Sequence, residues 1–245
     1  MTDRFLQGVV KNSTLMIGHR GAKGHIAENT LESISAALSL GADAIEIDVF
    51  RCKSGELVVF HDHTLERLTN GVGLVEEHSY AELSQLLVQK TYRIPLLSEV
   101  LSLLQGKVFL NIELKGADTA LPLHVLLNCK THAFHWNPSN LVVSSFLHDE
   151  LADLRKLDPG IAIGVLTEED PLLIIDFAKS LDAVSIHPYY RNLITGNAAL
   201  LKQLGFRIYP WTVNEPNEIK RMLSLGVDGI ISDYPELVQL YAMES

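Results

Sequence analysis

Apolar runs of strand length alternate with helix-period segments along most of this 245-residue chain. Such alternation indicates repeated strand–helix units around a parallel sheet. Helices are predicted between the strands, for instance over 29–40 and 215–225, each followed by a glycine that can end it. We place the strands at 15–18, 43–49, 108–114, 141–145, 161–165, 183–186, 206–210 and 228–231. Eight such units in one chain of this length predict a single α/β domain over 1–245, a (β/α)8 TIM barrel whose functional groups lie at the C-terminal ends of its strands.

A ninth apolar run, Leu57–His61, follows the second strand after only a short turn. A parallel crossover needs a dozen or more residues, so this run is expected to turn back antiparallel, as a hairpin above the barrel mouth. The hairpin would bring His61 and Asp62 towards the end of the second strand. Residues from 62 to about 95 then form a small insertion, of the kind that usually shapes a substrate pocket, and a barrel helix resumes near Ser98.

Charged and imidazole groups stand at the ends of the first three barrel strands. Because residues two apart on a strand share a face, carboxylates so spaced point the same way and would converge at the mouth. The groups are His19, Arg20, Glu46, Asp48, Glu113 and Lys115. Clustered like charges are costly without a cation between them, and all-oxygen ligation suits one divalent cation, Mg²⁺ or Ca²⁺, better than structural zinc. We therefore expect Glu46, Asp48 and Glu113 to bind the metal; the alternative is a set of salt bridges to Arg20 and Lys115.

The remaining groups at the predicted mouth suit a phosphate ester. His19 and His61 can exchange protons near neutral pH, one as acid and the other as base. The planar fork of Arg20 can bind two phosphate oxygens, and Lys115 supplies a point charge. Two aromatic residues at later strand ends, Trp211 and Phe146, are candidates to contact the carbon part of a substrate.

Two further features of the first loop stay open. Glu28 is a possible additional site carboxylate, and either Asn29 or Thr30 is expected to cap the first helix.

Composition narrows the class of partner. The chain has 20 Lys and Arg against 30 Asp and Glu, a net charge of −10, which argues against a nucleic-acid surface or an anionic membrane but not against a local pocket for one anion. The two cysteines, Cys52 and Cys129, are expected to be free thiols in a reducing compartment. The first residues lack the apolar core of a signal peptide, and no stretch approaches ~18 uncharged apolar residues. We expect a soluble, cytoplasmic protein with no membrane insertion.

Taken in order along the chain, the motifs resemble those of the glycerophosphodiester phosphodiesterases in their short cytoplasmic bacterial form. They are His19-Arg20-Gly21, Glu28-Asn29-Thr30, Glu46-Ile47-Asp48, Val59-Phe60-His61-Asp62, Ile112-Glu113-Leu114-Lys115, Trp211-Thr212 and Gly229 to Pro235. The resemblance implies a (β/α)8 barrel with a small insertion after His61-Asp62, and metal-dependent hydrolysis of glycerophosphodiesters to sn-glycerol 3-phosphate and an alcohol. It also implies that His19 and His61 are the acid–base pair.

Several alternatives remain at this point. The attacking group is either water or the glycerol 2-hydroxyl, and the preferred alcohol and the oligomeric state are not defined. A phospholipase D-type hydrolase or lyase acting on lysophospholipids or sphingolipids would need an apolar entrance, and the insertion shows no long exposed apolar run. A non-catalytic phosphate-ester-binding protein would have little use for two histidines and three carboxylates at one mouth.

Overall fold

A computed structural model describes residues 14–128 and 138–243. Its strands are β1 (Leu15–His19), β2 (Ala44–Arg51), β3 (Leu57–Val59), β4 (Phe109–Leu114), β5 (Leu141–Ser145), β6 (Ile163–Thr167), β7 (Ser185–Pro188), β8 (Arg207–Ile208) and β9 (Gly229–Ser232). Its α-helices are α1 (Leu31–Ser39), α2 (Tyr80–Leu83), α3 (Leu97–Leu104), α4 (Ala120–Asn128), α5 (His148–Leu157), α6 (Ile175–Ser180), α7 (Thr195–Gln203), α8 (Pro216–Ser224) and α9 (Pro235–Ala242). Short 3-10 turns cover Val75–Glu77, Pro138–Asn140, Pro171–Ile174 and Tyr190–Asn192.

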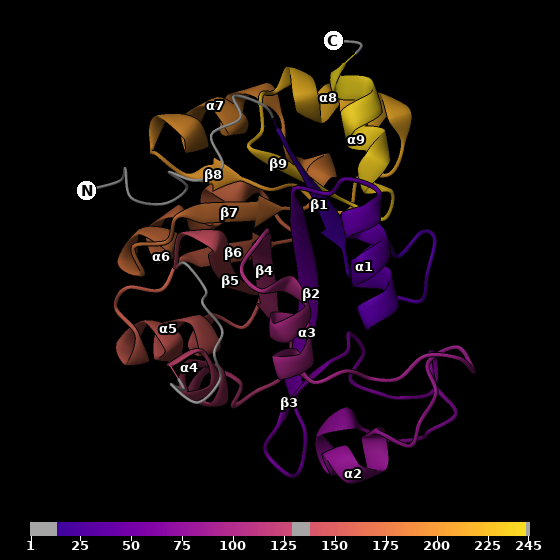
Figure 1. The fold of residues 1–245 in the computed structure, drawn as a ribbon. Helices are drawn as coiled ribbons and strands as arrows, with labels where there is room; N and C mark the ends of the chain where they lie inside the picture. Colours follow the sequence, from indigo (N-terminus) through magenta and orange to yellow (C-terminus); the bar gives the residue numbers. More distant parts are fainter. Residues whose placement is uncertain (1–13, 129–137, 244–245) are drawn as a thin grey trace.

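The strands other than β3 form a nearly closed parallel barrel. Neighbouring strands follow the order β8-β7-β6-β5-β4-β2-β1-β9. Backbone hydrogen bonds from Asp228 N–H to the Ile208 carbonyl (3.1 Å) and from Ile231 N–H to the Pro210 carbonyl (3.0 Å) join the two ends of this order. The larger helices surround the strands (Figure 1). The predicted (β/α)8 barrel is confirmed.

The β3 strand lies off the barrel path and pairs antiparallel with β2, as predicted, with Val59 opposite Val49. The chain after β3 contains α2 and loops that Figure 1 shows beside β3. These loops have a small apolar core of their own, built around Phe50, Phe60 and Leu65 and separate from the main cluster. The insertion is therefore anchored to the hairpin by buried side chains, and the chain enters the barrel again at α3.

Alternation along β2 explains why its acidic residues reach the barrel mouth. Ile45, Ile47 and Val49 belong to the main apolar cluster, which includes residues of α1 and α3. The residues between them, Glu46 and Asp48, must face the opposite side, towards the barrel interior. Parallel register then sets Glu46 beside His19 of β1 and Asp48 beside Glu113 of β4. Pairing of adjacent strands thus assembles the charged groups.

The first loop resolves the choice of helix cap. The Thr30 hydroxyl accepts a hydrogen bond from Ser33 N–H at 3.1 Å and so caps α1, which begins at Leu31 rather than at residue 29. The Asn29 side chain instead donates to Asp48 Oδ2 at 2.8 Å.

The structure bears on two further expectations, those on the cysteines and on membrane-spanning segments, but only within the described residues. The thiol of Cys52 is free and buried, whereas Cys129 lies outside the described residues. Within the described ranges, no helix has both the length and the apolar character needed to cross a bilayer.

Candidate active site

A cavity of about 250 Å³ opens at the C-terminal ends of the barrel strands. It gathers nearly every residue that the sequence singled out. Its lining includes His19, Arg20, Glu46, His61, Glu113, Lys115, Phe146 and Trp211. Of the predicted set, only Asp48 is not part of the lining, because it lies buried between Arg20 and Asn29.

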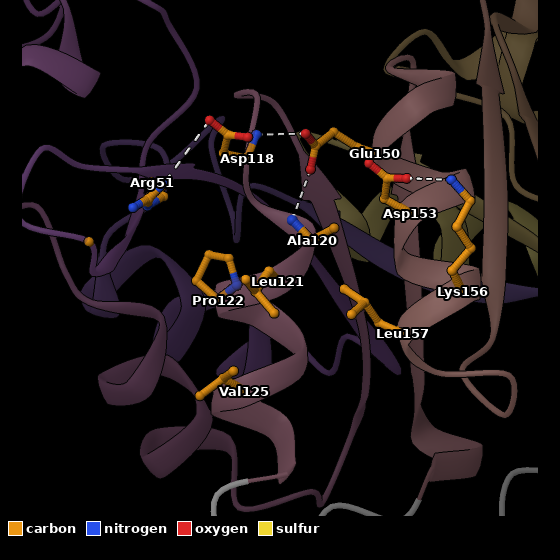
Figure 2. Close-up of a pocket in the computed structure, with 11 residues that line it drawn as sticks. Arg51, Asp118, Ala120, Leu121, Pro122, Val125, Glu150, Asp153, Lys156 and Leu157 are labelled. Carbon is orange, nitrogen blue, oxygen red and sulfur yellow. Dashed lines mark hydrogen bonds and ion pairs between the residues drawn. The ribbon is translucent and has the colours of Figure 1, made fainter.

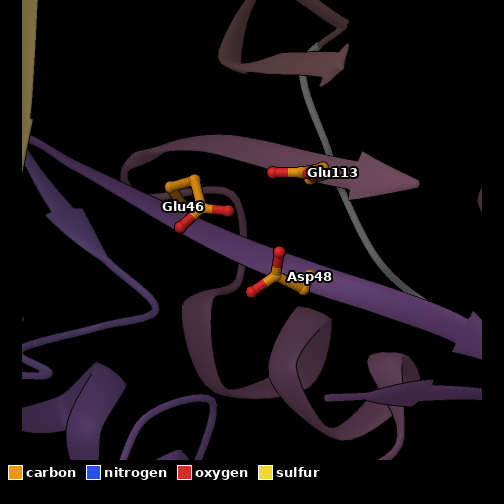
Figure 3. Close-up of side chains that lie close together, drawn as sticks. All are labelled: Glu46, Asp48 and Glu113. Carbon is orange, nitrogen blue, oxygen red and sulfur yellow. The ribbon is translucent and has the colours of Figure 1, made fainter. Parts of the chain in front are cut away.

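The three predicted metal ligands converge. Figure 3 shows the carboxylates of Glu46 and Asp48, from β2, directed towards that of Glu113, from β4. One oxygen from each lies within 4.8 Å of the others. Burial, together with the neighbouring Asp48 charge, raises the pKa of Glu46 well above its usual range and the pKa of Glu113 to about 7. These shifts show how costly the cluster is when no cation shares its charge.

Basic groups neutralise part of this cluster, as the salt-bridge alternative predicted. Arg20 Nε lies 3.2 Å from Asp48 Oδ2, and Lys115 Nζ lies 3.0 Å from Glu113 Oε1. Glu46 Oε2 accepts the backbone N–H of Arg20 at 2.9 Å, but Glu46 Oε1 is buried and has no hydrogen-bond partner among the described residues. An unpaired buried carboxylate oxygen beside two further carboxylates fits a hard divalent cation, so the residues present can hold one.

Each of the two cavity histidines is oriented by a carboxylate. His19 Nδ1 lies 2.6 Å from Asp233 Oδ1, and His61 Nδ1 lies 2.6 Å from Asp62 Oδ1. A neutral ring that donates its Nδ1 proton to a carboxylate keeps Nε2 as an acceptor. Burial lowers the pKa of both imidazoles, and the carboxylate hydrogen bonds oppose that shift. Both rings can therefore be neutral near pH 7 and still bind a proton.

Asp233 is itself held in place. Its Oδ2 accepts the Asn214 side-chain amide at 2.8 Å, and its backbone N–H donates to Asn214 Oδ1 at 2.9 Å. The sequence motif after β9 included Asp233 but gave it no separate role. Its position directly after a buried strand was the signal that could have identified it.

Arg20 is more tightly bound than the sequence suggested. Besides Asp48, its guanidinium contacts Glu28, with Nη1 2.5 Å from Oε1. Arg67, from the insertion, approaches the same Glu28 carboxylate at 2.7 Å. Glu28 is thus part of the charge network around the cavity. Arg67 was not predicted, because it lies in a turn with no periodicity to mark its direction.

Aromatic rings form one wall of the cavity. The rings of Phe146 and Trp211 meet edge to face with centroids 5.5 Å apart, and Tyr189 lies 5.6 Å from Trp211. The Trp211 indole N–H donates to the His187 carbonyl at 2.9 Å, which fixes the ring. The cavity therefore has one charged side and one apolar side.

A larger groove of about 510 Å³ lies elsewhere, between α4, α5 and the β2–β3 turn (Figure 2). Leu121, Val125 and Leu157 give it an apolar floor. Its charged groups are engaged: Asp153 pairs with Lys156 at 2.8 Å, and Glu150 accepts backbone N–H groups at the start of α4. It holds none of the strand-end groups, so the smaller cavity is the candidate active site.

Comparison with known proteins finds similar sequences and structures. Residues 19–237 match the glycerophosphoryl diester phosphodiesterase family. A glycerophosphodiester phosphodiesterase of Caldanaerobacter subterraneus subsp. tengcongensis is 37% identical over 234 residues, covering 91% of this chain and 95% of the relative. A human lysophospholipase D is 27% identical over 261 residues, covering 89% and 83%. A phosphodiesterase of Oleispira antarctica, solved with the product sn-glycerol-3-phosphate, superposes with a TM-score of 0.86 at 30% identity, covering 94% of this chain and 96% of that one.

Proposed function

The chain belongs to the glycerophosphoryl diester phosphodiesterase family, and on that premise we propose that it hydrolyses glycerophosphodiesters to sn-glycerol 3-phosphate and an alcohol in this cavity. One observation carries the proposal. Two imidazoles, each with Nδ1 on a carboxylate, face a single cavity that is also lined by two members of the three-carboxylate cluster and by two basic side chains. Phosphodiester hydrolysis needs this combination, because one oxygen must lose a proton, another must gain one, and the phosphoryl charge must be neutralised.

Glu46, Asp48 and Glu113 would hold one divalent cation, Mg²⁺ or Ca²⁺. When bound, that ion supplies positive charge to the phosphoryl oxygens, where negative charge grows during transfer. Arg20 and Lys115 also line the cavity and contribute further positive charge. Arg20 would keep its Asp48 and Glu28 contacts while its remaining N–H groups face the phosphate.

The two histidines would divide the proton transfers. One Nε2 takes the proton of the attacking hydroxyl as the new oxygen–phosphorus bond forms. The other Nε2, in an imidazolium, gives a proton to the alkoxide of the leaving alcohol as its bond to phosphorus breaks. Asp233 and Asp62 stabilise the positive charge that each ring carries in turn.

The aromatic side of the cavity would receive the carbon part of the substrate. Phe146 and Trp211 offer ring surface without charge, and the hydrogen bond of Trp211 to the His187 carbonyl holds its ring in place. A small phosphodiester is thus the expected partner, and the net charge of −10 disfavours nucleic acid. A cytoplasmic location remains a prediction from the sequence.

The test is hydrolysis by the purified protein with added Mg²⁺ or Ca²⁺, comparing glycerophosphocholine with lysophosphatidylcholine. We expect equal release of sn-glycerol 3-phosphate and choline from glycerophosphocholine, at a higher kcat/KM than for lysophosphatidylcholine. Preferred cleavage of lysophosphatidylcholine to lysophosphatidate would assign the cavity to a lysophospholipase D instead. Binding of either compound without turnover would make the protein a phosphate-ester-binding protein.

A further inference from the structure

Arg67 joins the two sides of the candidate site without lining the cavity. It lies in a turn of the insertion, with its side chain about half exposed. Its guanidinium donates to two carboxylates at once. Towards Asp62, Nε donates to Oδ2 at 2.5 Å and Nη2 donates to Oδ1 at 2.9 Å. Towards Glu28, Nη2 donates to Oε1 at 2.7 Å and Nη1 donates to Oε2 at 3.1 Å.

Each of these carboxylates holds a side chain of the cavity. Asp62 Oδ1 lies 2.6 Å from His61 Nδ1, and Glu28 Oε1 lies 2.5 Å from Arg20 Nη1. The chain of contacts therefore runs from His61 through Asp62, Arg67 and Glu28 to Arg20. It connects the hairpin side of the cavity to the loop after β1.

The backbone that carries Arg67 is well anchored. Leu65 and Leu68, on either side of it, are buried, and Leu65 packs in the small core of the insertion. Hydrogen bonds from Arg67 lower the pKa of Asp62, and hydrogen bonds and charge from Arg67 and Arg20 outweigh burial to lower the pKa of Glu28 to about 2. Both carboxylates are thus ionised acceptors, with their oxygens fixed by a rigid planar donor.

We infer that Arg67 is a positioning residue, which sets the relative placement of His61 and Arg20 and gives the insertion a role in catalysis. Without Arg67, Asp62 and Glu28 lose the cation that they share and the contacts that fix their orientation. His61 and Arg20, which these carboxylates hold, then lose their fixed relative placement. Small misplacements of acid–base groups are costly, on the order of 10²-fold for about 1 Å. This inference depends on the proposed hydrolysis only for its kinetic consequences.

Two substitutions test the inference against a matched control. Arg67→Gln removes the charge, and Arg67→Lys keeps the charge but cannot bind two carboxylates through a planar fork. Arg93→Gln is the control, since Arg93 belongs to the same insertion, is exposed like Arg67, and makes a long contact of 3.4 Å to the Ser84 carbonyl. Thermal unfolding of all three proteins reports folding, and glycerophosphocholine turnover reports kcat and KM separately.

We expect Arg67→Gln to lower kcat by about 10-fold or more with a smaller change in KM, Arg67→Lys to recover only part of the loss, and Arg93→Gln to resemble the wild type. The same substitution made in a His61→Ala background should cost less than it does in the wild type, because one of the two groups that Arg67 positions is gone. A kcat of Arg67→Gln within 2-fold of the wild type, or an equal loss in the His61→Ala background, would overturn the inference.

A second measurement separates this inference from the proposed function. Proton NMR of the His61 Nδ1–H, which is hydrogen-bonded to Asp62, needs no substrate. This resonance should be sharp in the wild type and in Arg93→Gln, and broadened by solvent exchange in Arg67→Gln. If it is unchanged in Arg67→Gln, positioning by Arg67 is wrong, whatever the protein hydrolyses. If it broadens in a protein that cleaves no phosphodiester, positioning holds and the proposed function fails.

Discussion

Replacement of Asp233 by asparagine tests how His19 is held. Asp233 uses both carboxylate oxygens, Oδ1 towards His19 Nδ1 at 2.6 Å and Oδ2 as acceptor from Asn214 at 2.8 Å. Asn214 is fixed in turn, because its Oδ1 accepts from Asp233 N–H and from the Ser232 hydroxyl. In Asp233→Asn, one of the two oxygens becomes an NH₂ group. In one orientation, the new NH₂ group faces the NH₂ group of Asn214, so that two donors oppose each other. In the other orientation, the NH₂ group faces His19 Nδ1, which must then be an acceptor, and the ring is forced into its other tautomer.

The expected loss follows from that single lost bond. A hydrogen bond that involves a charged group contributes about 1.5–3 kcal/mol. If His19 needs this bond in the transition state, kcat should fall by roughly 10- to 150-fold. The Asp233 hydrogen bond also opposes the effect of burial on the pKa of His19. Without it the pKa of His19 falls further, so the limb of the pH–rate profile that reports His19 should move to lower pH, whether this ring is acid or base.

The assay is steady-state hydrolysis of glycerophosphocholine across pH, with Asp153→Asn as control. Asp153 is a surface carboxylate 2.8 Å from Lys156, and its loss should leave kcat within 2-fold of the wild type. A kcat for Asp233→Asn equal to that of the control, with an unmoved pH profile, would refute the assignment of Asp233 as the group that orients His19.

The other predictions concern the metal ligands and the two sides of the cavity. Chelation should abolish turnover, added Mg²⁺ or Ca²⁺ should restore it, and Glu46→Gln should be severely impaired. Full activity in excess EDTA would show that the reaction does not require a metal. Because the folded-state pKa of Glu113 is raised from 4.5 to about 7, the metal-free protein should lose stability as the pH rises from about 4.5 to about 7. A saturating cation should remove that loss, and a Tm of the metal-free protein that does not change over this pH range would contradict the prediction. Arg20→Lys should lower kcat/KM equally for the glycerophosphodiesters of choline, ethanolamine and glycerol. An effect that varies with the alcohol would argue against phosphate recognition by Arg20. Trp211→Ala should lower kcat/KM by the equivalent of about 1–3 kcal/mol, and the loss should depend on the organic group of the substrate. A loss that is the same for every substrate would place Trp211 away from the organic group.

The barrel and the convergence of the charged groups followed from local patterns. Apolar runs bounded by turn residues marked the strands, and two-residue spacing placed Glu46 and Asp48 on one face. Only five residues, 52–56, connect β2 to Leu57, too few for a parallel crossover, so the antiparallel hairpin was also predictable. These features depend on chain geometry over short distances.

Contacts between distant side chains were not predictable in the same way. Nothing in the sequence shows that Arg67 donates to both Asp62 and Glu28, since this requires the fold of the insertion and of the loop after β1 together. Asn29 and Thr30 are both good capping residues, and only the position of Asp48 decides that Thr30 caps the helix and Asn29 binds the carboxylate. Arg20 was expected to be available to phosphate, whereas its neighbours Glu28 and Asp48 already use part of its fork.

The central claim is that His19 and His61 act on the same phosphodiester. The most direct measurement follows ³¹P NMR of glycerophosphocholine at saturating concentration with wild type, His19→Ala, His61→Ala and the double variant. Each single substitution should lower kcat by about 10² or more, and the double variant should lose far less than the product of the two, because either loss disables the same step. Near-wild-type release of sn-glycerol 3-phosphate by either single variant would contradict the account.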